Sequence, residues 1–241
     1  MDLQTILLEK SGQLKSPLWF SRPIEICYLS LNQIPDGLIK DALPFLSLEE
    51  QKRAKRIVNH NRYRRFILGH YFARLLLSRA LGIQPNEISI NFTEGSKPTL
   101  INPAIKLDFN ISHSHELIFV AIGKLRAIGI DIQEMRPLRS LERLIKFSHH
   151  QDEKKRLPSI LQKEHFYQTW TAKEALLKGD GRGLRSPMNR ISLKFDFRRD
   201  REREWQSASL DKSEFLQQDS WQIALKKFNS TYQIAIASLK D

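Results

Sequence analysis

The sequence predicts an α+β fold made of two similar halves. Two observations support this prediction. Helix-like and strand-like segments occur in a similar order twice, each time as a strand, then helices, then a run of strands. A chain of 241 residues is also long enough to bury one large core or two medium ones. The halves meet near residues 124–126, which gives two expected domains, 1–124 and 125–241.

The first half begins its helical part at a clear start signal. Ser47 and Glu50 have the spacing of a capping box, and a second helical pattern stops at Gly82, a residue suited to a helix C-terminus. One helix across this whole span would be unusually long, so we expect a break near residues 59–61. The strands predicted after it cover residues 88–92, 107–111 and 117–122.

The second half repeats this arrangement. A strand is predicted at residues 127–133, and helices are predicted at about 140–147 and 164–178. Further strands are predicted at 191–197, 221–226 and 232–238. The charged stretch 198–204 mixes basic and acidic residues, which is typical of a solvated hairpin loop rather than of an anion site.

Composition limits the class of protein. With 41% hydrophobic residues and no apolar run longer than residues 117–122, the chain resembles a globular protein and lacks a membrane span. Its single cysteine, Cys27, lies in a strand-like segment and is expected to be a buried, inert thiol. These features favour a cytoplasmic protein. The net charge of +12 favours anionic partners, which could be nucleic acid, phosphorylated small molecules or acidic proteins.

The strand at residues 127–133 carries a candidate functional carboxylate. Gly129, Asp131 and Gln133 share one face of it, and the isoleucines between them share the other. The glycine is expected to leave space for a bulky neighbour. On this strand alone, a structural hydrogen bond made by Asp131 is the favoured interpretation.

The helix at residues 164–178 adds a second carboxylate. Trp170, Glu174 and Lys178 follow at i, i+4 spacing on one face, although Glu174 and Lys178 could simply form a surface ion pair. The helix runs into a glycine-rich segment at residues 179–184, which suits close approach of a ligand. Together with Asp131, Glu174 could supply the one or two carboxylates that Mg²⁺ usually takes from a protein.

Hydroxyl, imidazole and basic side chains could hold phosphate groups. Ser112 and His113 lie at a predicted strand end or turn, where they either bind phosphate or merely cap the turn. They point to opposite strand faces and no G-x-S-x-G motif is present, so the sequence argues against nucleophilic serine catalysis. Upstream lie basic residues suited to phosphate or to plain solvation: Arg53, Arg56, Arg62, Arg64, Arg65 and Lys97. No aromatic residues alternate with them, so single-strand nucleic-acid binding gains no support.

These motifs, in this order, resemble the surfactin-type 4′-phosphopantetheinyl transferases. The matching segments are Arg65-x-x-x-Gly69, Lys97-Pro98, residues 109–114, residues 129–131, Trp170 with Lys173-Glu174, and residues 181–184. The resemblance covers about residues 47–187. It implies a pseudo-dimer of two α+β halves with the active site in the cleft between them. It also implies transfer of the phosphopantetheine arm of coenzyme A to a serine of an acyl or peptidyl carrier protein, with release of adenosine 3′,5′-bisphosphate.

The resemblance assigns expected roles to individual residues. Arg53 and Arg65 would contact the adenosine 3′-phosphate end, Lys97 and Pro98 the nucleotide, and Ser112 and His113 phosphate oxygens. Asp131, Gln133 and Glu174 would hold Mg²⁺ or Mn²⁺, and Lys173 and Lys178 would neutralise the diphosphate. The expected catalytic residues are Glu174 as acceptor of the serine proton, Lys178 beside the departing phosphate, and His113.

Two positions depart from the family pattern. Gln133 and Gln151 stand where many relatives have glutamate, so we expect altered metal affinity and the identity of the general base is open. Our hypothesis gives the base role to Glu174. His149 and His150 adjoin Gln151 and are interpreted as an incidental exposed pair.

The basic surplus fits the implied partners, which are polyanionic coenzyme A and acidic carrier proteins. We expect the carrier to dock near residues 136–155 and the chain to be a monomer, with no nucleic-acid or membrane partner. Two alternatives stay open: a coenzyme- or carrier-binding module that has lost catalysis through Gln133 and Gln151, and a basic nucleic-acid-binding protein. The preferred carrier, whether from fatty acid, polyketide or peptide synthesis, does not follow from the sequence.

Overall fold

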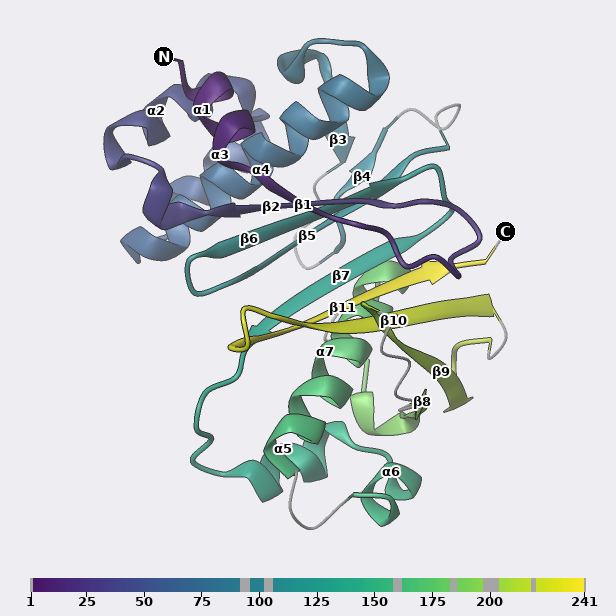
Figure 1. Ribbon diagram of the computed structural model, residues 1–241. Helices are drawn as coiled ribbons and strands as arrows, with labels where there is room; N and C mark the ends of the chain where they lie inside the picture. Colours follow the sequence, from purple (N-terminus) through teal and green to yellow (C-terminus); the bar gives the residue numbers. More distant parts are fainter. Residues whose placement is uncertain are drawn as a thin grey trace.

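The computed structural model has four layers, with helices, a first sheet, a second sheet and a long helix packed in that order (Figure 1). It describes residues 2–91, 96–101, 106–157, 162–182, 186–196, 204–217 and 220–240. The first sheet has the strand order β1-β2-β6-β5 and the second has the order β7-β11-β10-β9-β8, with antiparallel pairing throughout. The predicted α+β fold with two halves is confirmed.

The first half contains the helices that cover the first sheet. Its elements are α1 (Leu3–Lys10), β1 (Gly12–Leu14), β2 (Glu25–Ser30), α2 (Ile39–Ala42), α3 (Leu48–Lys55), α4 (His60–Leu81), β3 (Ile90–Asn91), β4 (Thr99–Leu100), β5 (Asp108–Ser114) and β6 (Leu117–Gly123). Short 3₁₀ turns lie at η1 (Leu31–Gln33), η2 (Asp36–Leu38), η3 (Leu43–Phe45) and η4 (Pro85–Glu87).

The second half contains the second sheet and the helices on its outer side. Its elements are β7 (Ile128–Glu134), α5 (Leu141–Ser148), α6 (Gln151–Lys155), α7 (Gln162–Asp180), η6 (Met188–Arg190), β8 (Ile191–Asp196), β9 (Gln206–Ser213), β10 (Trp221–Phe228) and β11 (Tyr232–Leu239). The predicted hairpin loop at residues 198–204 lies outside the described residues, except for Glu204.

The helix boundaries in the first half follow the expected signals. The Ser47 hydroxyl accepts from the backbone N–H of Glu50 at 3.2 Å, and the Glu50 carboxylate accepts from the N–H of Ser47 at 2.7 Å. Asn59 caps the start of α4 by accepting from the N–H of Arg62, and Gly82 ends that helix in the left-handed region with φ of 71°. The capping box, the break and the glycine terminus are all confirmed.

Three apolar layers hold the molecule together. Helices α2, α3 and α4 pack on the outer face of the first sheet, and α7 packs on the outer face of the second. Between the sheets, Ile128, Ile130 and Ile132 of β7 meet Phe119 of β6 and Ile26 of β2. Strand β6 is buried on both faces, which explains its uninterrupted apolar sequence.

Gly129 faces α7, and the bulky neighbour that the sequence predicted beside it is the backbone of this helix. A Cβ at this position would lie 1.8 Å from the carbonyl oxygen of Ala175 and 2.4 Å from the backbone nitrogen of Gly179. The space beside Gly129 is therefore filled by the backbone of α7 itself. Only glycine allows this helix to approach β7 so closely.

A row of side-chain hydrogen bonds joins the edge strands of the two sheets, and we call it the β5–β7 seam. In the seam, every second side chain of β5 accepts from every second backbone N–H of β7. The pairs are Asp108 with Ile128 at 2.6 Å, Asn110 with Ile130 at 2.9 Å, Ser112 with Ile132 at 3.2 Å, and Ser114 with Glu134 at 3.0 Å. The seam satisfies backbone donors that an edge strand would otherwise leave unpaired.

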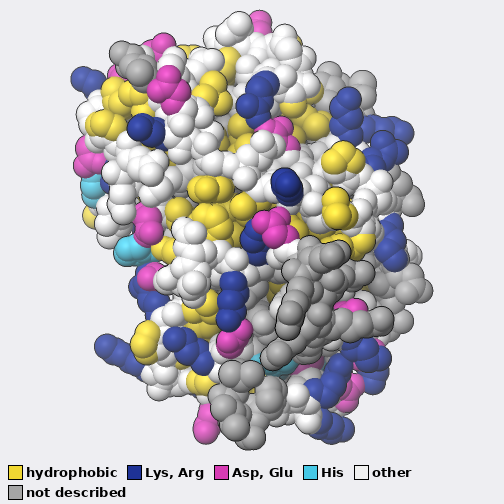
Figure 2. Space-filling view, viewed as in Figure 1, with side chains coloured by type: hydrophobic (Ala, Val, Ile, Leu, Met, Phe, Trp, Pro, Cys, Tyr) yellow, Lys and Arg dark blue, Asp and Glu magenta, His cyan; other side chains and the backbone are white. Residues whose placement is uncertain are grey.

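The basic surplus of the chain is distributed over its surface. On the face drawn in Figure 2, basic side chains are spread among acidic and apolar ones rather than gathered into one patch. Within the described parts of the chain, no helix has both the length and the apolar character needed to cross a membrane. Cys27 is buried, as predicted, and burial together with the nearby Glu25 raises the pKa of its thiol to about 12.

Candidate active site

Asp131 is the centre of a buried polar cluster where the two halves meet. Its side chain is only 2% exposed. One carboxylate oxygen, Oδ1, accepts from the Ser112 hydroxyl at 2.9 Å and from Lys178 Nζ at 2.6 Å. The other, Oδ2, accepts from Gln133 Nε2 at 3.1 Å. The cluster thus combines β5 of the first half with β7 and α7 of the second.

Glu174 is the second carboxylate of this cluster. It projects from α7 and is buried, and Lys178 follows one turn later on the same face. Burial and the negative charge of Asp131 raise the pKa of Glu174 above the ordinary range of a glutamate, against the opposing effect of Lys178. Two buried carboxylates side by side are unfavourable unless a proton or a cation offsets their repulsion.

The donor set fits a divalent cation that prefers oxygen ligands. Among the residues described, no group of three or more His, Cys, Asp and Glu side chains has metal-binding geometry. Asp131, Glu174 and the amide of Gln133 nevertheless offer two carboxylates and one neutral oxygen on neighbouring elements. Mg²⁺ commonly takes one or two carboxylates from the protein and its other ligands from phosphate and water.

Ser112 and His113 point in different directions, as their adjacent positions on a strand require. The buried Ser112 hydroxyl donates to Asp131 and accepts from Lys178 Nζ at 3.0 Å and from the N–H of Ile132. These three contacts of the hydroxyl are all with the protein itself, and its role as a phosphate contact stays a prediction. His113 reaches the surface in a crowded region, and partial loss of hydration there, with the charges of Lys178 and Arg65, lowers its pKa.

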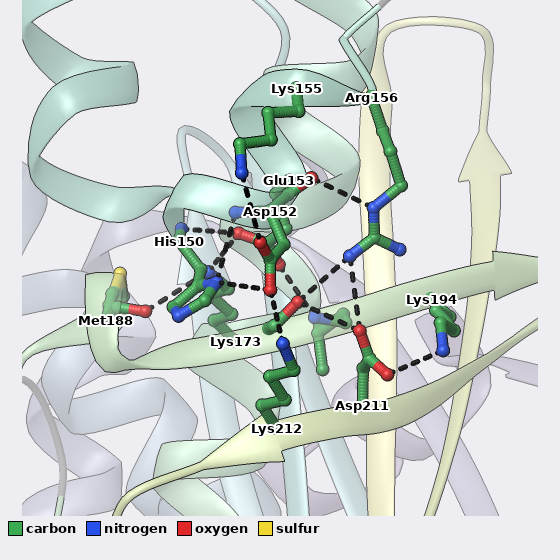
Figure 3. Close-up of polar contacts among 12 residues, drawn as sticks. His150, Asp152, Glu153, Lys155, Arg156, Lys173, Met188, Lys194, Asp211 and Lys212 are labelled. Atoms are coloured by element: carbon green, nitrogen blue, oxygen red, sulfur yellow. Dashed lines mark hydrogen bonds and ion pairs between the residues drawn. The ribbon is translucent and has the colours of Figure 1, made fainter.

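Lys173 was expected beside the diphosphate, and the structure places it elsewhere. Its side chain is fully buried, and its ammonium donates to Glu153 Oε2 at 2.6 Å, the carbonyl of Ser148 at 2.8 Å and the carbonyl of Met188 at 3.1 Å. Figure 3 shows this separate cluster between α6, α7 and β8. Lys178 is thus the lysine of α7 that reaches Asp131.

Lys97 and Pro98 lie at the other end of the seam. Lys97 Nζ forms an ion pair with Asp108 and donates to the carbonyl of Ile128 at 2.7 Å. This pair borders a cavity of about 640 Å³, which Gly179, Gly181 and Trp221 also line. Gly181 has a φ of 86°, so the chain leaves α7 through a conformation that favours glycine. Residues 183 and 184 of the predicted glycine-rich segment lie outside the described residues.

Arg53 and Arg65 lie on α3 and α4. The Arg53 guanidinium stands 5.7 Å from the centre of the Phe66 ring. Arg65 Nη1 donates to the carbonyl of His115 at 2.9 Å, and partial burial with the neighbouring charges of Arg62 and Arg136 lowers the pKa of Arg65. This concentration of guanidinium groups beside the exposed His113 suits an anionic ligand.

The segment around Gln151 differs from the predicted pair of exposed histidines. His149 is fully buried, and its Nδ1 lies 2.8 Å from the Ser148 hydroxyl, so the expected pair of exposed histidines is wrong. His150 caps α6, with its Nδ1 accepting from the N–H of Asp152 at 3.1 Å. Gln151 is exposed at the first position of α6.

Sequence reasoning missed the structural part that β5 plays in this site. Asp108 and Asn110 were not assigned any role, yet they form the seam with Ser112 and Ser114. The signal was present, because polar residues occupy every second position of an otherwise apolar strand. An alternation of this kind indicates a strand with one polar face and does not identify the partner of that face.

Comparison with known proteins gives the same assignment in both halves. Residues 37–124 match the family profile described as 4′-phosphopantetheinyl transferase, N-terminal. Residues 127–237 match the profile of the 4′-phosphopantetheinyl transferase superfamily.

Individual relatives agree. The chain is 33% identical over 180 residues to 4′-phosphopantetheinyl transferase HetI of Nostoc sp. (strain PCC 7120), across 69% of this chain and 76% of the relative. It is 29% identical over 154 residues to 4′-phosphopantetheinyl transferase Sfp of Bacillus subtilis (strain 168), across 63% of this chain and 67% of the relative. With a 4′-phosphopantetheinyl transferase of Bacillus subtilis the match is 30% over 152 residues, 62% of this chain and 66% of the relative.

The two matched regions, together with the four-layered fold and its junction of carboxylates and lysine, place the chain in the 4′-phosphopantetheinyl transferase family of enzymes. The family assignment predicted from the motifs is confirmed.

Proposed function

We propose that this chain transfers the 4′-phosphopantetheine arm of coenzyme A to a serine hydroxyl of an apo carrier protein, with Mg²⁺, and releases adenosine 3′,5′-bisphosphate. The observation that carries the proposal is the buried pair of Asp131 and Glu174 with Lys178 beside it, at the junction of the halves. Such a pair is costly unless the site receives a cation and a polyanionic ligand.

Asp131, Glu174 and Gln133 would hold the Mg²⁺ ion, and Mn²⁺ suits the same oxygen donors. The metal would offset negative charge on the diphosphate as its bridging bond breaks. Gln133 supplies a neutral oxygen where a carboxylate would add charge, so metal affinity is expected to be moderate rather than absent. Because Gln133 Nε2 now donates to Asp131, its amide must turn for the oxygen to reach the metal.

Glu174 is the proposed general base for the incoming serine hydroxyl. Its carboxylate lies in the cluster beside Asp131 and Lys178, where the serine hydroxyl would approach the phosphorus. Lys178 is the proposed stabiliser of the departing phosphate, because its ammonium already stands in the cluster, 2.6 Å from Asp131. The serine proton would pass to Glu174 while the serine oxygen attacks the phosphorus and the adenosine bisphosphate leaves.

The nucleotide end is proposed to lie along the first half. Arg53 and Arg65 would bind the adenosine 3′-phosphate, His113 a phosphate oxygen, and the turn at Lys97 and Pro98 the nucleotide. The exposure of His113 and the group of guanidiniums around Arg65 support this direction. In this proposal residues 1–124 hold the nucleotide and residues 125–241 hold the metal and the carrier.

The carrier is proposed to dock on the segment from residue 136 to residue 155. Its exposed cations are Arg136, Arg139, Arg143, Lys146, Lys154 and Lys155. Among them Phe147 is 60% exposed, so an apolar contact lies within a basic surface. This combination suits an acidic helical protein. We also propose that the chain acts as a monomer.

One assay tests the proposed function. The chain is incubated with coenzyme A, Mg²⁺ and several apo carriers of fatty acid, polyketide and peptide synthases, and the carriers are weighed by mass spectrometry. We expect the phosphopantetheine mass increment, lost on chelation of the metal. No increment on any carrier would overturn the proposal. Binding of coenzyme A without transfer would instead identify a module that has lost catalysis.

A further inference from the structure

We propose that Lys173 and Glu153 form a positioning pair that holds Glu174 against Asp131, an inference that rests on the proposed function. We call Lys173, Glu153 and the carbonyl groups of Ser148 and Met188 the Lys173 node. Lys173 and Glu174 are consecutive in α7, so their side chains leave the helix about 100° apart. When the contacts of Lys173 fix the rotation of α7 about its axis, they also fix the direction in which Glu174 leaves the helix.

The Lys173 node ties α7 to the elements around it. Its ammonium donates to the end of α5, to α6 and to η6. Both oxygens of Glu153 are used as well, because Oε2 also accepts from the N–H of His150 at 2.8 Å and Oε1 accepts from the N–H of Leu193 at 2.8 Å. Figure 3 shows Lys173, Glu153, His150 and Met188 close together, with more exposed ion pairs such as Arg156 with Asp211 around them.

Repulsion between Glu174 and Asp131 acts to separate α7 from β7, and the ion pair of Lys178 with Asp131 at 2.6 Å opposes it one turn further along the helix. At Glu174 itself, the close contact that Gly129 allows with β7 does not fix the direction of the side chain. The Lys173 node supplies a directional restraint on the neighbouring face of the helix, one residue from Glu174. Lys173 is completely buried and Glu153 is 2% exposed, so the pair is shielded from solvent.

Stability alone does not explain why a charged pair occupies this place. Taking two charges out of water costs about as much as their attraction returns, and well-packed neutral replacements are often as stable. A charged pair does fix geometry, because an ammonium with three acceptors tolerates few arrangements. The Lys173 node also connects α7 with α5 and α6, the segment proposed to receive the carrier. It would thereby set the distance between the docked carrier and Glu174.

The first half contains a matched control. There the buried carboxylate of Glu50 pairs with Arg74 Nη2 at 2.7 Å, and Arg74 also donates to the carbonyl of Pro85 at 3.1 Å. The residue after Arg74 is Leu75, which lies in the core and has no proposed chemical role. A neutral replacement of this pair removes the same kind of bond without displacing Glu174.

The test compares K173M/E153Q with E50Q/R74M and the wild type. We measure the midpoint of thermal unfolding, kcat at saturating coenzyme A, KM for coenzyme A, and the affinity for Mn²⁺ by electron paramagnetic resonance. For K173M/E153Q we expect kcat to fall at least tenfold, KM for coenzyme A to change less than twofold, and Mn²⁺ to bind several-fold more weakly. For E50Q/R74M we expect kcat per folded molecule and Mn²⁺ affinity to stay within twofold.

Failure of the inference can be told apart from failure of the proposed function. A wild type that transfers nothing contradicts the function, whereas an active wild type with an equally active K173M/E153Q contradicts the positioning role alone. Equal losses of kcat and Mn²⁺ affinity in both double variants, in proportion to their loss of stability, would also overturn the positioning role. If K173M/E153Q does not fold, the single variant E153Q is judged by the same measurements, since it keeps the carbonyl partners of Lys173.

Discussion

Glu50 and Glu153 occupy corresponding positions in the two halves. Each is the third residue of a short helix, closes its capping box, and pairs with a cation on the next long helix. Glu50 meets Arg74 of α4 at 2.7 Å, and Glu153 meets Lys173 of α7 at 2.6 Å. Each cation also donates to a carbonyl at a following 3₁₀ turn, η4 or η6. The two halves therefore share this arrangement of a capping glutamate, a cation and a 3₁₀ turn, although the cations differ.

Replacing Glu174 is expected to abolish most transfer. Glu174→Gln removes the proposed base and one metal ligand, so kcat should fall by a factor of about 10² or more, as is typical when an acid–base group is lost. The rate is measured by the mass increment on a carrier at saturating coenzyme A. Glu164→Gln on the same helix, where Glu164 forms an ion pair with Lys227 at the surface, serves as the control. Near-full activity of Glu174→Gln with Mg²⁺ still bound would refute the assignment.

Restoring a third carboxylate should tighten metal binding. Gln133→Glu places a negative charge beside Asp131, so the Mg²⁺ concentration that gives half-maximal rate should fall several-fold. Without metal the same change adds repulsion among buried carboxylates, and the unfolding midpoint should drop. Gln206→Glu on the exposed face of β9 is the matched control. An unchanged Mg²⁺ requirement would show that residue 133 does not face the metal.

The contact at Gly129 predicts a strong effect on stability. Gly129→Ala would place a methyl group 1.8 Å from the Ala175 carbonyl, so β7 and α7 must separate, at a cost of roughly 3 kcal/mol or more. Gly69→Ala in α4 is the control, because its Cβ would lie 3.6 Å from the nearest atoms and alanine favours a helix by about 1 kcal/mol. Urea unfolding of both variants measures the difference, and equal stabilities would contradict the close packing.

Glu50 should make the protein sensitive to acid. Burial alone would raise its pKa, but the hydrogen bond and charge of His70, the charge of Arg74 and the N–H of Ser47 lower it to about 2. A folded pKa below the unfolded value stabilises the protein above about pH 4.5, and this contribution, about 3 kcal/mol, is lost as the pH falls from there toward 2. Urea unfolding between pH 5 and pH 3 should show a steeper loss for wild type than for Glu50→Gln. If the stabilities of wild type and Glu50→Gln fell in parallel with pH, Glu50 would not be the source of the acid sensitivity.

Cys27 should not react with alkylating reagents while the protein is folded. Its thiol is buried, and its pKa is raised to about 12, so almost no thiolate is present at pH 8. Iodoacetamide should label it only after unfolding in urea. Rapid labelling of the native protein at pH 8 would show that the strand β2 opens readily.

The sequence was most informative about structural features that depend on residues close together in the chain. The capping box at Ser47, the glycine end at Gly82 and the alternation around Asp131 each arise from neighbours in the chain, so spacing alone predicts them. The strand β9 was missed because its sequence is polar and gives little sign of the sheet that pairs with it on both sides.

The directions of individual side chains depended on tertiary contacts. Lys173 stands in a motif beside Glu174, yet its acceptors come from Ser148, Glu153 and Met188, far away in sequence. Ser112 faces a carboxylate brought to it by another sheet. Spacing on one helix or strand gives the face of a residue and cannot give the partner that packs there.

The β5–β7 seam restricts one half to discrete positions along the other, two residues apart. Its donors and acceptors repeat every second residue, so a slide of one repeat would preserve much of its bonding while changing which β5 side chain meets Asp131. Asn110 or Ser114 would then stand where Ser112 now donates to the carboxylate. The register between β5 and β7 therefore decides which of four polar side chains contacts Asp131. In the observed register that side chain is Ser112.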